Sequence, residues 1–163
     1  MSVTSSDNSG IDIANVPTWQ VGIVQSHALR TTKKIADNFL KPYGLTRMHW
    51  YIVGAIADTG NDGIRITDLA KQLGTTVGYL TTAVNNLETQ GKVLRSGHKH
   101  DNRTKILKVS PDYIATCTEI EQGLSKQFRE TVFKRMNARE LATYVNVLYK
   151  LTQLSQPAKK EKA

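Results

Sequence analysis

The chain has 163 residues, 39% of them hydrophobic and 7% aromatic, which is enough for one compact domain or a small domain with a helical extension. Its apolar stretches are a few residues long, far short of the roughly 20 residues that a membrane-spanning helix needs. The polar first 18 residues also lack the apolar segment of a signal peptide. These features argue against a membrane-spanning or secreted protein and predict a cytoplasmic location.

The chain is basic, with 22 Lys and Arg residues against 14 Asp and Glu residues and a net charge of +8. An excess of this size favours a polyanionic partner, which can be nucleic acid or an anionic membrane surface, and charge alone does not choose between them. The single cysteine, Cys117, excludes an intramolecular disulfide and suits a reducing compartment.

The first third of the chain predicts an arm and two helices. Residues 1–16 are rich in Ser, Asn, Asp and Thr, a composition typical of a flexible arm. Apolar residues at helical spacing predict a helix over Thr18–Leu40, which Pro42 ends. A second helix is predicted over Thr46–Asp58, with Thr46 as its N-cap.

Short elements follow at close spacing. Ile64–Ile66 alternates like a lone strand. Thr67 can cap a helix over Asp68–Leu73, and Thr75 or Thr76 can cap another that runs to Gln90. A glycine stands directly after each of these helices. The residues expected to face inward from the second helix are Val77, Leu80, Val84 and Leu87.

Two strands are then predicted, Lys92–Arg95 and Lys105–Val109, joined by the charged loop Ser96–Thr104. Helix, turn, helix, strand, basic loop and strand in this order form the plan of a winged helix-turn-helix. Two amphipathic helices are expected after Pro111, with a break near Asn137. The predicted fold class is therefore mainly α, with a small β-hairpin wing and flanking helices at both ends.

Charge is divided unevenly between the second helix of this unit and the hairpin. Six basic residues stand between Lys92 and Lys108 against one acid, Asp101, whereas the helix over residues 75–90 has no Lys or Arg. Its exposed face is predicted to offer donors and acceptors to base edges and phosphates: Thr75, Thr76, Gly78, Tyr79, Thr81, Thr82, Asn85 and Asn86. A solvated hairpin beside an ordinary helix is the alternative, but the combination favours duplex DNA as the partner.

The stretch Leu45–Ser110 resembles the multiple-antibiotic-resistance regulator (MarR) family. The similar segments are GLTRMHWYIVGAI, ITDLAKQLGTTVGYLTTAVNNLETQGKVLRSG and DNRTKILKVS, and the D-x-R-x-x-x-L-x-V-[ST] pattern in the last is the most specific. The resemblance implies a homodimer that binds a pseudopalindromic operator, usually as a repressor. It also implies release by a small aromatic effector.

Site residues follow from the same resemblance. Arg103 matches the wing arginine of the minor groove, and Asp101 matches the acid that orders the wing, with Arg95 as a candidate partner. The concentration of positive charge in the hairpin adds Lys99 and Lys105 to the predicted DNA contacts of the wing. A possible effector pocket is assigned to Trp19, His27, His49 and Trp50, although core packing explains the aromatic residues nearly as well.

The resemblance also divides the chain. The expected parts are a flexible N-terminal arm (1–16), an N-terminal dimerisation helix (17–44), a winged helix-turn-helix DNA-binding domain (45–110), C-terminal dimerisation helices (111–156) and a disordered basic tail (157–163).

Other functions find less support in the sequence. His27, His49, His98 and His100 stand at no recognisable metal-ligand spacing, so neither a metal nor a cofactor is predicted. Cys117 lies on an apolar helix stripe, which favours an inert thiol over a redox sensor. No catalytic motif is present, so no enzymatic activity is predicted. An interaction module that keeps the fold with only weak, non-specific DNA binding is the alternative function, because the predicted reading helix is uncharged.

Overall fold

The structure is a computed structural model that describes residues 17–98 and 101–154, with the backbone alone for residues 98, 101–104 and 154. The predicted arm and basic tail therefore lie outside the described residues. The helices are α1 (Thr18–Leu40), α2 (Arg47–Ala57), α3 (Ile66–Gln72), α4 (Val77–Thr89), α5 (Ile114–Thr131) and α6 (Ala138–Leu154). The strands are β1 (Ile64–Arg65), β2 (Val93–His98) and β3 (Asp101–Val109).

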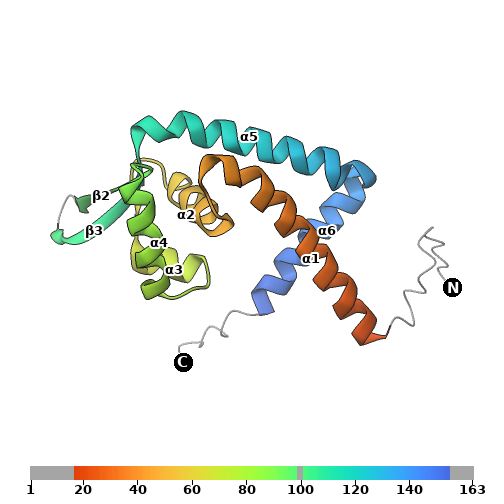
Figure 1. The fold of residues 1–163 in the computed structure, drawn as a ribbon. Coiled ribbons are helices and arrows are strands. Elements are labelled where there is room, and N and C mark those ends of the chain that lie inside the picture. Colours follow the sequence, from red (N-terminus) through yellow and green to blue (C-terminus); the bar gives the residue numbers. More distant parts are fainter. Residues whose placement is uncertain (1–16, 99–100, 155–163) are drawn as a thin grey trace, which may run out of the picture.

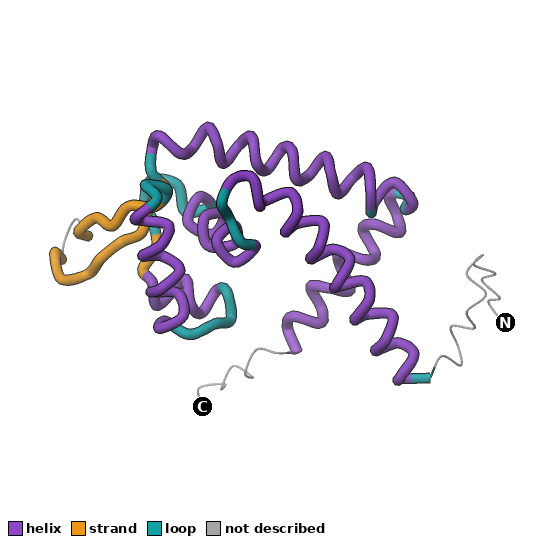
Figure 2. Tube along the Cα trace, viewed as in Figure 1, coloured by secondary structure: helices purple, strands orange, loops and turns teal. Residues whose placement is uncertain are grey.

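The elements form a compact unit with a helical extension. Figure 1 shows α2, α3, α4 and the β2–β3 hairpin gathered on one side, with α5 running across the top of this unit. The first half of α1 and the whole of α6 extend away from it on the other side. Figure 2 shows that strands occur only in the hairpin and the short β1 segment next to α3, so the described fold is mainly helical with one small sheet, as predicted.

Local sequence explains where α2 begins. The Thr46 hydroxyl accepts a hydrogen bond from the His49 backbone N–H (3.1 Å), and His49 Nδ1 accepts one from the Thr46 N–H (3.4 Å). This reciprocal pair is a capping box, which satisfies two N–H groups that the first turn of a helix leaves unpaired. The predicted N-cap of this helix is confirmed.

The start of α3 differs from the prediction. The helix begins at Ile66 with Arg65 as its N-cap, so Thr67 lies inside the first turn and is not the cap. Arg65 is still paired with β3 in the sheet, and its side chain bonds Asp68 in the first turn of the helix (3.0 Å). A strand that passes directly into a helix leaves no room for a separate capping residue.

The three strands form an antiparallel sheet in the order β1-β3-β2. Gly63 lets β1 approach β3, because a Cβ atom there would lie 2.6 Å from the Leu107 carbonyl oxygen. Its φ of 70° also favours glycine. The wing strands are longer than predicted and leave only residues 99–100 between them. Hydrogen bonding between β2 and β3 overrides the low strand propensity of the polar residues there.

The core lies where α2, α3 and α4 meet the sheet and the first half of α5. Its fully buried large side chains are Leu40, Ile52, Val53, Ile56, Leu69, Leu80, Val84, Leu87, Val93, Leu107 and Ile120. Val77 was predicted to face inward, but it is 41% exposed. It is the first residue of α4, one turn beyond the end of the packed face, and Ala83 occupies the core instead.

The helix α5 contacts α1 and leads toward α6 at its end. A Cβ atom on Gly123 would lie 2.5 Å from the ring of Phe39, so this glycine lets α1 pack closely on α5. Asn137 lies at the break before α6 and caps that helix. Its Oδ1 accepts hydrogen bonds from the backbone N–H groups of Arg139 and Glu140 (3.0 Å each). None of the described helices is both long and apolar enough to cross a bilayer.

Candidate nucleic-acid interface

The turn between α3 and α4 fixes the angle of α4. Gly74 adopts a left-handed conformation (φ 61°), and the Thr75 N–H donates to the Ala70 carbonyl at 3.0 Å, closing the end of α3. The Thr76 hydroxyl then accepts a hydrogen bond from the Tyr79 N–H (3.3 Å) and caps α4. Of the two threonines left open as caps by the sequence, Thr76 is the cap.

One face of α4 is buried and the opposite face is open to solvent. Leu80, Val84 and Leu87 have no exposed surface. The predicted contact residues on the open side that are exposed are Thr76, Gly78, Tyr79, Thr82, Asn85 and Asn86, while Thr75 and Thr81 are half-buried. Exposed Val77 adds an apolar side chain to this face, which the sequence analysis did not include.

Some polar side chains of this face are engaged in hydrogen bonds within the chain, and others are not. Asn85 accepts a hydrogen bond from Arg95, and Asn86 accepts one from Gln90. Thr81 donates to the Val77 carbonyl one turn back. Within the described chain, the Thr82 and Tyr79 side chains make no hydrogen bond. They are the predicted contacts with the most freedom to bond an external partner.

Arg95 joins the wing to α4. Its Nη2 donates to Asn85 Oδ1 at 2.6 Å, and its Nε lies 3.5 Å from Glu88 Oε2. Arg95 was predicted to contact DNA or to pair with Asp101, and the structure places its guanidinium against the helix. A local sequence pattern could not show this contact, because β2 and α4 meet only in the folded chain.

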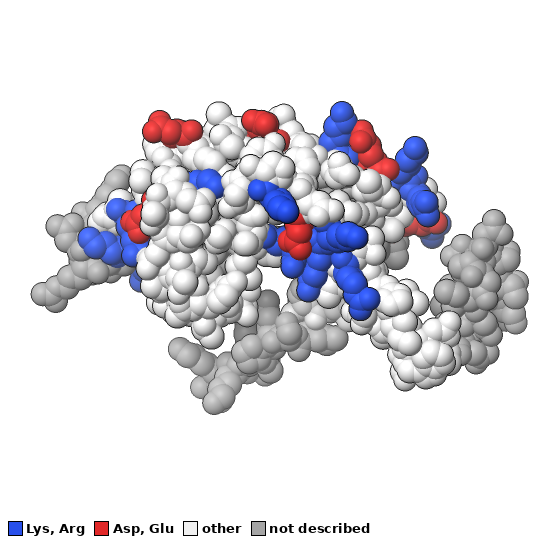
Figure 3. Space-filling model, viewed as in Figure 1, with Lys and Arg blue, Asp and Glu red and all other residues white. Residues whose placement is uncertain are grey.

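The remaining wing positions are less fully defined. Lys105 is exposed on β3, opposite Gly97 of β2. The side chains of Lys99, Asp101 and Arg103 lie outside the described residues, so their predicted roles stay predictions. Figure 3 shows Lys and Arg side chains gathered where the wing leaves the body of the molecule.

Lys92, which the sequence counts among the basic residues of the wing, has an internal role. Its Nζ donates to the Tyr43 carbonyl (2.9 Å) and to Gln90 Oε1 (2.7 Å), and it lies 5.5 Å from the centre of the Tyr113 ring. Burial lowers the pKa of Lys92. This lysine therefore ties the end of α4 to the turns before α2 and α5.

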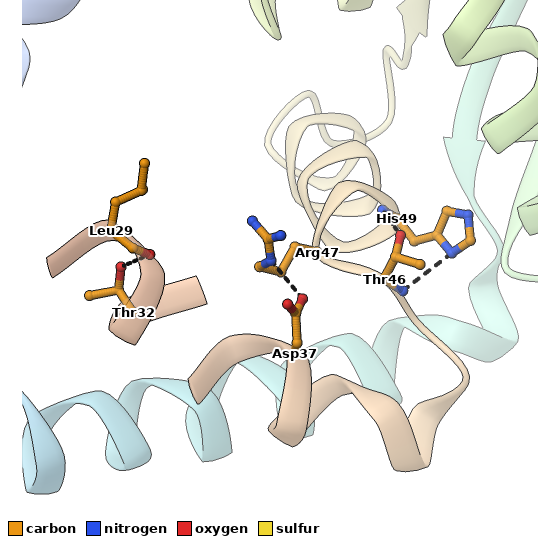
Figure 4. Close-up of polar contacts among 6 residues, drawn as sticks. All are labelled: Leu29, Thr32, Asp37, Thr46, Arg47 and His49. Atoms are coloured by element: carbon orange, nitrogen blue, oxygen red, sulfur yellow. Dashed lines mark hydrogen bonds and ion pairs between the residues drawn. The ribbon is translucent and has the colours of Figure 1, made fainter. Parts of the chain in front are cut away.

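A cavity of about 490 Å³ lies between α1, α2 and α5, and we call it the α1–α2–α5 cavity. Its wall includes Trp50 of the predicted effector residues, together with Lys33 and Arg47. Figure 4 shows Arg47 of α2 directed at Asp37 of α1, where Nε and Oδ1 are 2.6 Å apart. That hydrogen bond raises the pKa of Arg47.

The other predicted effector residues are not in this wall. Trp19 and His27 lie on the exposed first half of α1. His49 turns back toward Thr46, as Figure 4 shows, and burial followed by the nearby charge of Lys92 lowers its pKa. The structure therefore brings only Trp50 of the four to the cavity.

The part of the chain that the structure describes contains neither a metal-binding cluster nor an activated cysteine. No three His, Cys, Asp or Glu side chains gather there in a way that could hold a metal ion. Cys117 is half-buried on α5, and burial raises the pKa of its thiol, which reduces the fraction of nucleophilic thiolate.

Fold and geometry together define a winged helix-turn-helix protein, with an exposed polar helix beside a basic hairpin. Residues 43–104 match the model of the MarR family. The chain is 26% identical over 118 residues to the multiple antibiotic resistance protein MarR of Salmonella typhimurium, covering 72% of this chain and 81% of the relative. The matched segment runs from the turn before α2 into β3, so the similarity to the MarR family covers the winged helix-turn-helix unit.

Solved structures show the same fold. A mutant MarR from E. coli, crystallised with operator DNA, superposes with a TM-score of 0.71 at 22% identity and covers 80% of this chain and 92% of its own. The MepR–DNA complex from S. aureus superposes with a TM-score of 0.68 at 20% identity, covering 85% and 98%. At these identities the likeness is one of fold.

Proposed function

We propose that the chain is a homodimeric, sequence-specific repressor that binds a pseudopalindromic operator in double-stranded DNA. In this proposal α4 enters the major groove, and the wing, which carries Arg103, reaches the adjacent minor groove. The related structures determined with DNA support it, as MarR of E. coli was crystallised with its operator. The proposal places the protein in the cytoplasm and assigns it no enzymatic activity.

The observation that carries the proposal is the open face of α4. Thr82 and Tyr79 have no hydrogen-bond partner within the described chain, and both are exposed on a helix that its buried face holds rigidly. Arg95 fixes the wing to the same helix through Asn85, so helix and hairpin form one continuous surface. Polar groups on a rigid helix can read base edges, while exposed cations of the wing attract phosphates.

The apolar surface outside the core supports a dimer. Large hydrophobic side chains on α1 and α6 are between 37% and 66% exposed: Trp19, Val21, Ile23, Val24, Leu29, Tyr144, Val145, Val147, Leu148, Tyr149 and Leu151. Large apolar side chains exposed in this number are typical of a subunit interface. Pairing two copies through α1, α5 and α6 would present two α4 helices to half-sites about 10 bp apart.

A mobility-shift assay with the protein's own promoter region, at moderate salt and with excess competitor DNA, tests the proposal. We expect a preference of at least about 10³-fold over random duplex, at the lower end for specific DNA-binding proteins. Equal binding to both would overturn sequence-specific recognition. A stoichiometric protein partner in the absence of any DNA preference would favour the interaction module instead.

We further propose that a small aromatic effector enters the α1–α2–α5 cavity and weakens operator binding. Trp50 offers an aromatic surface there, and Lys33 offers a positive charge. Benzoate and phenol are suitable probes, and benzoate is expected to bind more tightly. Trp50→Ala should abolish the effect of benzoate on operator affinity, whereas His27→Ala, outside the cavity, should keep it. Equal responses of the two variants would overturn this assignment.

A further inference from the structure

A second cavity, of about 390 Å³, lies where the wing joins α5, and we call it the wing-root cavity. Its wall comes from the end of α2, from β2 and β3, and from the first turns of α5. The residues that matter for its chemistry are Ala57, Leu94, Lys108, Ile114 and Cys117. None of these residues belongs to the predicted DNA contacts or to the effector pocket.

This cavity is separate from the α1–α2–α5 cavity. Tyr51 and Ala55 of α2 line the α1–α2–α5 cavity, whereas Ala57 lines the wing-root cavity. The two linings share no residue. The wing-root cavity is also at the opposite end of α5 from α6 and its exposed apolar side chains.

The wall combines apolar surface with one positive charge. Leu94 is 44% exposed and Ile114 is 54% exposed, so large aliphatic side chains on two different elements meet solvent there. Lys108 is the charged residue among the described residues of the wall, and it makes no ion pair or hydrogen bond through its side chain with them. Its stem packs over Gly63, where a Cβ atom would lie 2.9 Å from the Lys108 Cγ.

We propose that the wing-root cavity binds a small organic anion with an apolar body. The carboxylate of such a ligand pairs with Lys108, and its apolar body covers Leu94 and Ile114. Removing this aliphatic surface from water favours binding, and a charge without an internal partner favours an acid over a neutral molecule of the same shape. The ligand contacts both wing strands and α5, so it sets the position of the wing relative to α5.

A consequence for DNA follows, and this consequence rests on the proposed function. The wing supplies predicted phosphate and minor-groove contacts, so a ligand at its root changes operator affinity. The site is thus a second point of regulation, independent of the α1–α2–α5 cavity.

Cys117 provides a specific readout of occupancy. It is the single cysteine of the chain and it lines the wing-root cavity. A ligand that fills the cavity must slow the alkylation of this thiol, whereas a ligand in the α1–α2–α5 cavity leaves the thiol open to solvent. The rate of Cys117 alkylation by iodoacetamide at fixed pH, followed by mass spectrometry, therefore measures this site alone.

The experiment compares octanoate with 1-octanol on the full chain. We expect saturating octanoate to slow alkylation at least tenfold, and octanol to protect much less at the same concentration. Lys108→Met should remove the advantage of the acid. Lys105→Met is the matched control, because it removes an exposed lysine of the same strand that does not line the cavity, and octanoate should protect Cys117 in it as strongly as in the wild type.

Two further measurements make the result decisive. Ala57→Phe fills the cavity and should abolish protection, with folding checked by circular dichroism. In protein labelled at isoleucine methyl groups, the Ile114 resonance should shift saturably with octanoate, and Lys108→Met should weaken this binding. Absence of both protection and a saturable Ile114 shift would overturn the proposed site, as would equal protection by acid and alcohol in the wild type.

Measurements of operator affinity distinguish the ligand site from the proposed function. Octanoate is expected to change the operator affinity of the wild type several-fold and to leave that of Ala57→Phe unchanged. Cys117 protection without any change in affinity would overturn the regulatory consequence while supporting the site. Cys117 protection in a protein that shows no DNA preference would overturn the proposed function and still support the site.

Discussion

The winged-helix unit and the helices that extend from it differ in how far they bury their apolar side chains. Among the residues that the structure describes, every large side chain with less than 2% exposure lies between Leu40 and Ile120. By contrast, Trp19 near the start of α1 and Tyr149 on α6 are each 66% exposed. The winged unit contains the buried core, whereas the extension leaves large apolar side chains exposed.

The largest effect is expected from the core of the winged unit. Leu80→Ala removes a side chain with no exposed surface and should lower the free energy of unfolding by about 2–5 kcal/mol, through lost burial and a residual cavity. Urea unfolding at a fixed protein concentration measures this change. Tyr79→Ala, its exposed neighbour, should cost no more than about 0.5 kcal/mol. Similar losses for the two variants would contradict the inside–outside assignment of α4.

Substitutions in the helical extension should change dimerisation and not the stability of the folded subunit. Leu148→Asp places a charge in the exposed apolar surface of α6 and should weaken dimerisation at least about tenfold, because burying an unpaired carboxylate is costly. Sedimentation over a range of concentrations measures the dimer. Asn61→Asp, which adds the same charge to an exposed position in the turn after α2, outside the proposed interface, is the control. An unchanged dimer in Leu148→Asp would place the interface elsewhere.

Within the winged unit, substitutions in the wing and in α4 should affect DNA binding differently. Arg103→Ala should weaken binding to most sequences and reduce the slope of log affinity against log salt by about 1, because one phosphate or groove contact is lost. Titrations at several salt concentrations, with operator and random duplex, measure both effects. An unchanged slope would show that Arg103 is not such a contact.

Thr82→Ala is the counterpart in α4. It should cost about 1–3 kcal/mol for the preferred base and leave the salt slope unchanged, since an uncharged side chain neutralises no phosphate. Asn85 is a less clean choice, because its Oδ1 holds Arg95 and its loss also frees the wing. Loss of affinity across all sequences in Thr82→Ala would contradict its assignment as a base reader.

The smallest effect concerns the cap of α2. The pKa of His49 in the folded chain is lowered from 6.5, chiefly by burial, so the unfolded chain binds this proton at a higher pH than the folded chain does. Stability should therefore fall as pH drops below about 6.5 and level off beneath the folded pKa. Protonation also removes the acceptor that Nδ1 offers to the Thr46 N–H.

His49→Gln tests this linkage, because glutamine completes a capping box without titrating. Unfolding curves between pH 7.5 and 5.5 should show a weaker pH dependence in this variant than in the wild type. The same pH dependence in both proteins would mean that His49 does not contribute to it.

The order of the elements could be predicted because its signals are local. Helical periodicity, the Thr46 and Thr76 caps and the glycines after α3 and α4 each act within a few residues. The inaccurate boundaries lie where long-range pairing competes with local signals. Arg65 is held in the sheet and so α3 begins early, and pairing between β2 and β3 extends the wing beyond its β-prone residues.

The sequence by itself determined the elements, the charged wing and the uncharged α4, because periodicity and charge are properties of neighbouring residues. Only the tertiary structure decided what those residues contact. It turned Arg95 toward Asn85 and Lys92 toward Tyr43, left Thr82 open, and brought only Trp50 of the expected effector residues to a cavity. Such contacts join segments that are from 10 to 49 residues apart in the chain, and only packing of the core brings those segments together.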